Sequence, residues 1–143
     1  MTSLLLPRRI DASRPALVRV APDAVPAGFP SPAQDYYEGP LDFNTHLMDD
    51  PDGTFVARVA VSSMTGDGIF DGDEVIVSRA RRPVDGNIVV AVLNGELTLK
   101  HLGVTRRGVY LLSSNPEFPA IAVPELADFT IWGTATFGIR HLT

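Results

Sequence analysis

Short apolar runs separated by turn-forming residues fill this chain from residue 54 to its end. In the first run, residues 54–61, every second side chain is apolar, which is the pattern of a strand with one buried face. Gly, Pro, Asp and Asn occupy the gaps between runs, and most runs are too short for helices. The runs are residues 54–61, 74–77, 88–93, 97–102, 109–112, 121–123 and 129–139. The chain is therefore predicted to be mostly β, with a single compact domain of antiparallel or mixed strands.

Asn94 and Gly95, between two of these runs, give the most specific local prediction. Both positions of a tight two-residue hairpin turn need positive φ, which Asn and Gly tolerate. Such a turn also sets the register of the two strands, and this register places Lys100 opposite Val89. The run 88–93 is apolar on both faces, as in a strand buried on both sides, so Lys100 is expected to project over apolar surface.

Residues 1–40 differ from the rest because they hold seven of the 12 prolines. Proline lacks an amide hydrogen and restricts the residue before it, which excludes a long helix or a central strand here. We therefore expect an extended, mobile N-terminal arm over residues 1–40 and a β-rich domain over residues 41–143. Asp42 is expected to cap a short helical turn at residues 43–48.

Composition excludes several functional classes. The net charge of −5 and the scattered basic residues argue against direct sequence-specific DNA binding through phosphate contacts. The sequence contains no cysteine, and its three histidines are isolated, so neither a metal site nor a cofactor is predicted. The apolar run at residues 4–6 is too short for a signal peptide or a membrane span, which predicts a soluble, cytoplasmic protein with no membrane partner.

Lys100 stands out because the other 11 of the 12 basic residues are arginines. Arginine cannot lose its proton in a protein, whereas a lysine buried without a counter-charge has a lowered pKa and can act as a base. Chance retention of one lysine in an arginine-rich sequence is the alternative explanation. The expected apolar surroundings favour a chemical role.

Ser62 and Ser63 supply the hydroxyls that such a base could activate. They directly follow the run 54–61 and precede glycines that permit a tight turn. A serine at a strand-to-turn junction has nearby backbone N–H groups that could bind an oxyanion. Segments of this composition are more often plain turns, so the pattern alone leaves both interpretations open.

Several of these segments together resemble one known family. Ser63, which precedes Met64, lies 37 positions before Lys100 (100 − 63), and Lys100 belongs to the second strand of the expected hairpin. The similar segments are residues 55–56, 63–64, 68–69, 71–73, 86, 89–91, 95–100 and 111–123. The chain is identified by them as a UmuD-like member of the LexA/UmuD self-cleaving serine–lysine peptidases. The resemblance implies that Ser63 is the nucleophile, that Lys100 is the general base, and that the backbone of Ser62 and Ser63 forms the oxyanion hole.

The arm also resembles this family. Ala27 and Gly28 precede a Phe-Pro-Ser-Pro segment, residues 29–32, which is similar to the UmuD cleavage region. The resemblance implies self-cleavage between Ala27 and Gly28 in the bacterial DNA-damage (SOS) response, stimulated by a RecA–single-stranded DNA filament. The shortened form is then expected to join a Y-family, UmuC-like polymerase subunit in error-prone translesion synthesis. Homodimerisation through C-terminal strands that include residues 129–139 is also implied.

The sequence departs from the family pattern at a few positions. Val61 and Ser62 stand where the family usually has Gly-Asp, which leaves Ser62 as an alternative nucleophile. His101 replaces a second lysine and is predicted to be structural, because it points to the opposite face from Lys100. Three other functions remain open: a catalytically silent UmuD-like subunit that regulates a polymerase, a LexA-type repressor without its DNA-binding domain, and a membrane signal peptidase. Against the last two stand the Pro-rich arm, which cannot encode a helix-turn-helix domain, and the missing membrane span.

Overall fold

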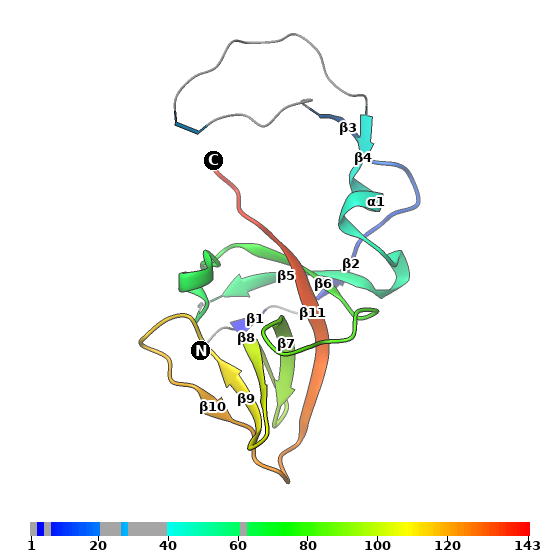
Figure 1. The fold of residues 1–143 in the computed structure, drawn as a ribbon. Coiled ribbons are helices and arrows are strands. Elements are labelled where there is room, and N and C mark those ends of the chain that lie inside the picture. Colours follow the sequence, from blue (N-terminus) through cyan, green and yellow to red (C-terminus); the bar gives the residue numbers. More distant parts are fainter. Residues whose placement is uncertain (1–2, 5–6, 21–26, 29–39, 61–62) are drawn as a thin grey trace.

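The computed structural model describes residues 3–4, 7–20, 27–28, 40–60 and 63–143. Nine of the strands form one sheet, which is the largest structure in the described part of the chain (Figure 1). Its strands are β1 (Ser3–Leu4), β2 (Arg8–Arg9), β5 (Thr54–Ala60), β6 (Glu74–Ser78), β7 (Ile88–Leu93), β8 (Glu96–Thr105), β9 (Gly108–Leu112), β10 (Ile121–Ala122) and β11 (Phe129–Ile139). They follow the order β1-β5-β6-β11-β7-β8-β9-β10, and β2 also pairs with β5. The mostly β, antiparallel fold class predicted from the apolar runs is confirmed.

The β7–β8 hairpin has the predicted turn and register. Asn94 and Gly95 adopt φ values of 50° and 83°, which a tight two-residue hairpin turn requires. Val89 lies opposite Lys100 across the hairpin. The register is therefore correctly predicted by a turn signal two residues long.

The last strand of the chain, β11, lies in the middle of the sheet between β6 and β7. Its pairing shifts register at two places, next to Trp132 and next to Thr136, and such bulges bend a strand and increase its twist. Gly133 lies at the first shift, where a Cβ atom would come within 2.6 Å of Val77 Cγ1. A residue without a side chain is needed there for β11 to approach β6.

A buried apolar cluster joins β5, β6, β7 and β8 with the loop that follows β5. Burying one such side chain fully contributes roughly 1.5–3 kcal/mol to folding. The cluster consists of Ala57, Val59, Met64, Ile69, Val75, Val77, Val90 and Leu99. Because Met64 belongs to it, the loop after β5 is held by the core.

Strand β8 is covered on both faces. Side chains alternate along a strand, so Leu99 points into the apolar cluster while Thr98 and Lys100 point to the other side of the sheet. All three are at most 3% exposed. A lysine in the middle of this strand therefore lies in the protein interior.

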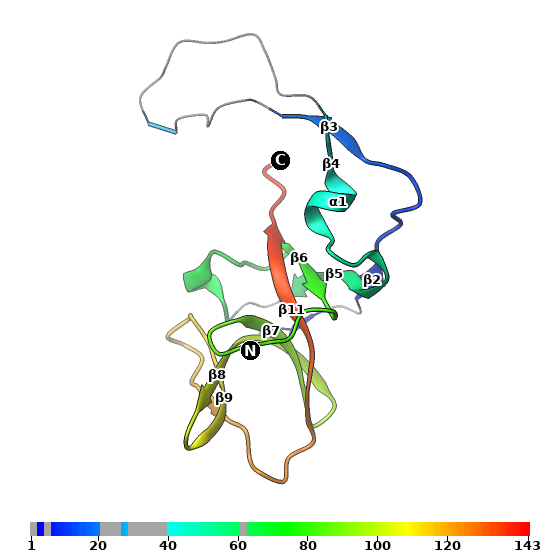
Figure 2. The ribbon, with the colours of Figure 1, turned by 45° about the vertical axis from the view of Figure 1, so that its right-hand side comes forward.

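The N-terminal part of the chain forms short elements outside the main sheet and at its edge (Figures 1 and 2). Asp42 caps the helix as predicted, because its carboxylate accepts hydrogen bonds from Asn44 N at 3.0 Å and Ala16 N at 2.9 Å. These elements are β3 (Leu17–Arg19), which pairs with β4 (Pro40–Asp42), and α1 (Phe43–Leu47). The described strands before residue 20 have two or three residues each, in keeping with the prolines of this region. The division into an arm and a domain at residues 40 and 41 stays a prediction.

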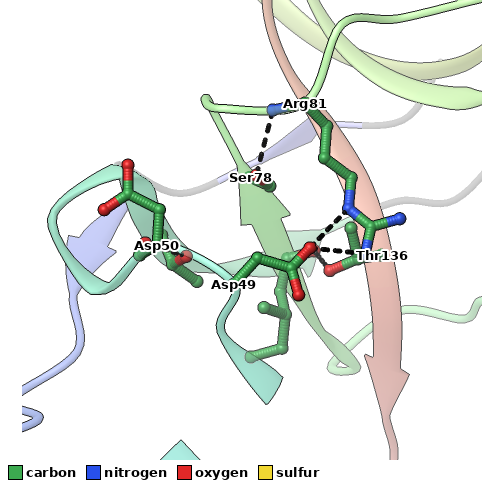
Figure 3. A network of polar contacts seen from close by, with 7 residues as sticks. Asp49, Asp50, Ser78, Arg81 and Thr136 are labelled. Atoms are coloured by element: carbon green, nitrogen blue, oxygen red, sulfur yellow. Dashed lines mark hydrogen bonds and ion pairs between the residues drawn. The ribbon is translucent and has the colours of Figure 1, made fainter. Parts of the chain in front are cut away.

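Polar contacts fasten the chain where it enters β5 (Figure 3). Thr54 Oγ1 donates a hydrogen bond to the Asp50 carbonyl at 2.6 Å. Arg81 forms an ion pair with Asp49 at 2.6 Å, and its backbone N–H donates to Ser78 Oγ at 3.3 Å. The ion pair is more than half exposed on both sides, so its own contribution is about 1 kcal/mol or less. The contacts connect the segment after α1 with the turn after β6.

Candidate active site

Ser63 lies in the loop that follows β5, and its side chain is fully buried. Its carbonyl accepts a hydrogen bond from Ser114 N at 3.0 Å, which attaches this loop to the segment after β9. The next residue, Met64, is buried in the apolar cluster. A short 3-10 helix, η2 (Thr65–Asp67), follows and ends at Gly68, whose φ of 78° favours glycine. The serine is thus held from both sides by packing and by a backbone hydrogen bond.

Lys100 is 1% exposed and is the largest of the fully buried side chains in the described part of the chain. Apolar Val89, which is also fully buried, lies directly opposite it on β7. The ring of Phe118 covers the amine, with Nζ 5.4 Å from the ring centroid. These neighbours keep water from the amine.

Lys100 and Ser63 are brought together by the fold although 37 positions separate them. Lys100 Nζ donates a hydrogen bond to Ser63 Oγ, and both groups are buried. Burial disfavours the charged ammonium and lowers the pKa of Lys100 below its ordinary value. A lysine with a lowered pKa beside a serine hydroxyl has the arrangement of a general base and its nucleophile.

Residues 19–136 match the family described as Peptidase S24-like. The chain belongs to this family. It is accordingly a SOS-related protein of the serine-peptidase type.

Several relatives of this Peptidase S24-like chain are similar over most of its length. Protein SamA of Salmonella typhimurium strain LT2 is 42% identical over 106 residues, which are 74% of this chain and 75% of SamA. Protein ImpA of Escherichia coli is 40% identical over 120 residues, or 83% of this chain and 81% of ImpA. The LexA repressor of Leptothrix cholodnii is 38% identical over 119 residues, which cover 82% of this chain and 51% of the repressor. The matches to SamA and ImpA thus cover at least about three quarters of both partners, whereas about half of the repressor has no counterpart in its match.

Ala27 and Gly28 do not meet the serine–lysine pair in this structure. Both residues are exposed, and a Cβ atom at Gly28 would have nothing within 4 Å. Figures 1 and 2 show this two-residue segment apart from the sheet that carries Lys100. The structure thus presents the expected cleavage site away from the site that would cut it.

Ser62 lies outside the described residues. Its expected part in the oxyanion hole, and its role as the alternative nucleophile, therefore stay predictions. The contact to Lys100 described above is made by Ser63.

Sequence reasoning missed several neighbours of the serine–lysine pair. Phe118 over the amine and Ser114 on the Ser63 carbonyl both come from the segment between β9 and β10. No spacing rule relates this segment to the hairpin, so the sequence had no signal for either contact.

His101 lies on the face opposite to Lys100, as predicted, and its ring contacts Asp67. For the contact between His101 and Asp67, the sequence offered one signal, an acidic residue close to Ser63.

The described ranges contain neither a candidate metal site nor a candidate membrane span. There, no three His, Asp or Glu side chains gather in a way that could hold a metal ion. The helices found in the same ranges are all too short or too polar to cross a membrane. The serine–lysine pair is thus the site in the described structure with the clearest chemistry.

Proposed function

We propose that this Peptidase S24-like protein is a self-cleaving serine–lysine endopeptidase that cuts its own arm between Ala27 and Gly28. Ser63 is the nucleophile and Lys100 is the general base. The single observation that carries the proposal is the hydrogen bond between Lys100 Nζ and Ser63 Oγ in a buried, apolar setting. A charged lysine is unfavourable there, so the setting favours the neutral amine that a base must be.

The proposed reaction begins when neutral Lys100 Nζ takes the proton of Ser63 Oγ. The oxygen attacks the carbonyl carbon of Ala27, and backbone N–H groups of Ser62 and Ser63 hold the negative oxygen that forms. The Lys100 ammonium then donates its proton to the nitrogen of Gly28 as the peptide bond breaks, which leaves an acyl-enzyme. Water hydrolyses this ester with Lys100 again as base, so that Ser63 and neutral Lys100 are restored.

Docking of the arm must come before chemistry, because Ala27 and Gly28 are exposed in the described structure. The arm is part of the same chain, so the rate depends on how often it reaches the site. By analogy with the family, a RecA–single-stranded DNA filament favours the docked state. The exposed cleavage segment supports a regulated rather than a constitutive cut.

The resemblance to UmuD-like proteins and the matched relatives support the following biological role. The shortened protein acts as a homodimer in the cytoplasm. It is the accessory subunit of an error-prone Y-family, UmuC-like polymerase in SOS mutagenesis and translesion DNA repair. Residues 1–40 serve as the cleavable arm and residues 41–143 as the peptidase-like domain.

Intact-mass spectrometry after incubation at pH 7.5 and pH 10 tests the proposal. A new mass that corresponds to a chain beginning at Gly28 should appear, and faster at pH 10, because a larger fraction of Lys100 is neutral there. Ser63→Ala should remain intact at both pH values, whereas Ser62→Ala should still be cut. If Ser62→Ala is the inactive variant instead, the nucleophile is wrongly assigned. A folded wild-type chain that stays intact even with a RecA filament would support the catalytically silent subunit.

A further inference from the structure

His101, the residue after Lys100 on β8, makes two polar contacts on the opposite face of the sheet. Its Nε2 lies 2.8 Å from Asp67 Oδ2, and its Nδ1 lies 3.1 Å from the Gly86 carbonyl. The His101 and Asp67 side chains are 27% and 30% exposed, so the pair is partly shielded from solvent. The contact is therefore stronger than a fully exposed ion pair of the same length.

Asp67 belongs to the loop that carries the nucleophile. It ends η2, four positions after Ser63, and its backbone N–H donates to the Met64 carbonyl at 3.0 Å. His101, by contrast, adjoins the residue that carries the amine. The Asp67–His101 contact thus joins the nucleophile's loop directly to the strand of the base.

Ser114 completes this connection from the segment after β9. Its N–H donates to the Ser63 carbonyl at 3.0 Å, and its hydroxyl donates to Met64 Sδ at 4.0 Å. The loop approaches it so closely that a Cβ atom at Gly66 would lie 2.2 Å from the Ser114 carbonyl oxygen. Three separate contacts therefore hold the Ser63 loop against β8 and against the segment that follows β9.

The Asp67 carboxylate favours the contact. Partial burial raises the pKa of Asp67, but hydrogen bonds from Ser114 and His101 and the charge of His101 outweigh it and lower the pKa below the ordinary value. Asp67 is thus an acceptor, as is the Gly86 carbonyl. A His101 ring that carries a hydrogen on Nε2 donates it to this carboxylate, 2.8 Å away.

The serine and the lysine depend on different kinds of structure for their positions. Lys100 lies within a ten-residue strand that pairs on both sides, whereas Ser63 lies in a loop. A nucleophile and its base need relative positions accurate to about half an ångström, and a displacement of about 1 Å can slow a reaction roughly 100-fold. A loop reaches such accuracy only when it is tied to the element that carries its partner.

We propose that Asp67 and His101 form a clamp that sets the position of Ser63 relative to Lys100. Both are positioning residues, since neither touches the reacting atoms. The kinetic part of this inference rests on the self-cleavage proposed above. Its structural part, the protection of Lys100 by a clamped loop, can be measured without any cleavage.

A pair that only stabilises the fold would give a different result when Lys100 is titrated. Opening the clamp should loosen the Ser63 loop and admit water to Lys100, whose lowered pKa is caused by burial. The pKa of Lys100 should then rise toward the ordinary lysine value of 10.5. A purely stabilising pair would change the melting temperature and leave the titration of Lys100 unchanged.

The single lysine makes this titration direct, because ¹³Cε-labelled lysine gives one side-chain signal, that of Lys100. His101→Ala and Asp67→Asn should each raise its midpoint by about half a unit or more, as expected when desolvation is relieved. The double variant should shift it no further than the more affected single variant, because one contact is lost in all three. His141→Ala is the matched control, since His141 forms a similar contact with Glu74 at 2.6 Å on another part of the surface. It should leave the midpoint in place.

Self-cleavage rates give the second measurement. His101→Ala and Asp67→Asn should cut about 10- to 100-fold more slowly than the wild type, as expected for a displaced nucleophile. His101→Lys should recover most of the rate, because its amine can still reach Asp67, and His141→Ala should cut normally. Unchanged midpoints in both single variants, or wild-type rates in both, would overturn the clamp. A wild-type chain that does not cut would refute the self-cleavage proposal alone, since the titration would still decide the clamp.

Discussion

The N-terminal arm and the central strands of the sheet differ in how strongly the rest of the chain holds them. Strand β8 pairs with β7 through six residue pairs and with β9 through five, whereas β3 and β4 share three. Lys100 in β8 is 1% exposed, while Leu17 in β3 is 62% exposed. The proposed catalytic groups therefore lie in the well-packed region, and the proposed cleavage site lies in the weakly held one.

This difference suits an enzyme that is its own substrate. Catalytic groups need fixed relative positions, which a packed sheet provides. A substrate segment must move, and segments with few buried contacts open at the lowest free-energy cost. A protein built in this way can keep its active site assembled while the cut waits for the arm to dock.

The largest expected effect concerns Lys100, which lies in the well-packed sheet. Lys100→Arg should reduce self-cleavage at least about 1,000-fold, because arginine keeps its proton at every accessible pH. Intact-mass spectrometry over several days at pH 10 measures the loss. Circular dichroism must show a wild-type fold, and Lys100→Met serves as a second variant if the larger guanidinium disturbs the core. Cleavage by either folded variant would exclude Lys100 as the base.

The second effect tests how tightly the sheet is packed. Gly133→Ala should lower the free energy of unfolding by about 1–3 kcal/mol, because its Cβ would lie 2.6 Å from Val77 Cγ1. Gly138→Ala on the same strand is the control, since its Cβ would meet nothing within 4 Å and its cost should be about 0.5 kcal/mol or less. Urea denaturation compares the two variants. Equal losses would mean that β11 is not pressed against β6.

The third effect concerns how the buried Lys100 amine changes the stability of the folded protein with pH. Because the pKa of Lys100 is lower in the folded chain than in the unfolded one, the unfolded chain binds more protons between the folded-state pKa and about 10.5. The contribution of Lys100 to stability should therefore rise with pH across this window. Below the window the buried amine lowers the stability of the wild type, and Lys100→Met has no such cost. This variant should therefore be more stable than the wild type there, and the difference in stability should shrink toward pH 10.5. Thermal melts of both proteins in a pH series measure it, and parallel curves would contradict the lowered pKa.

The smallest effect is expected at Asp42, whose carboxylate binds the arm at Ala16. Hydrogen bonds from Ala16 N, Asn44 N and Thr45 lower the pKa of Asp42, so these bonds should weaken as pH falls through this lowered pKa. Asp42→Ala removes them and should speed amide exchange severalfold at Ala16 and Asn44, with little change in the melting temperature of the sheet. Hydrogen-exchange mass spectrometry at neutral pH tests this. A large fall in the melting temperature would show that the arm is part of the core.

The local elements of this protein could be predicted from its sequence. Alternating apolar residues located the strands, and Asn94-Gly95 set the register that places Lys100 opposite Val89. The cap at Asp42 was equally readable, since capping depends on residues within one turn. Such features depend on neighbours in the chain, and a single sequence contains all of them.

The sequence by itself thus determined the strands, the hairpin register and a lysine directed into apolar surroundings, while its resemblance to a family pointed to Ser63. Only the tertiary structure decided that Ser63 reaches Lys100, that Phe118 covers the amine, and that Asp67 meets His101. These contacts depend on how β5, β8 and the segment after β9 are arranged in space. That arrangement follows from long-range pairing, such as the insertion of β11 between β6 and β7, which no local pattern specifies.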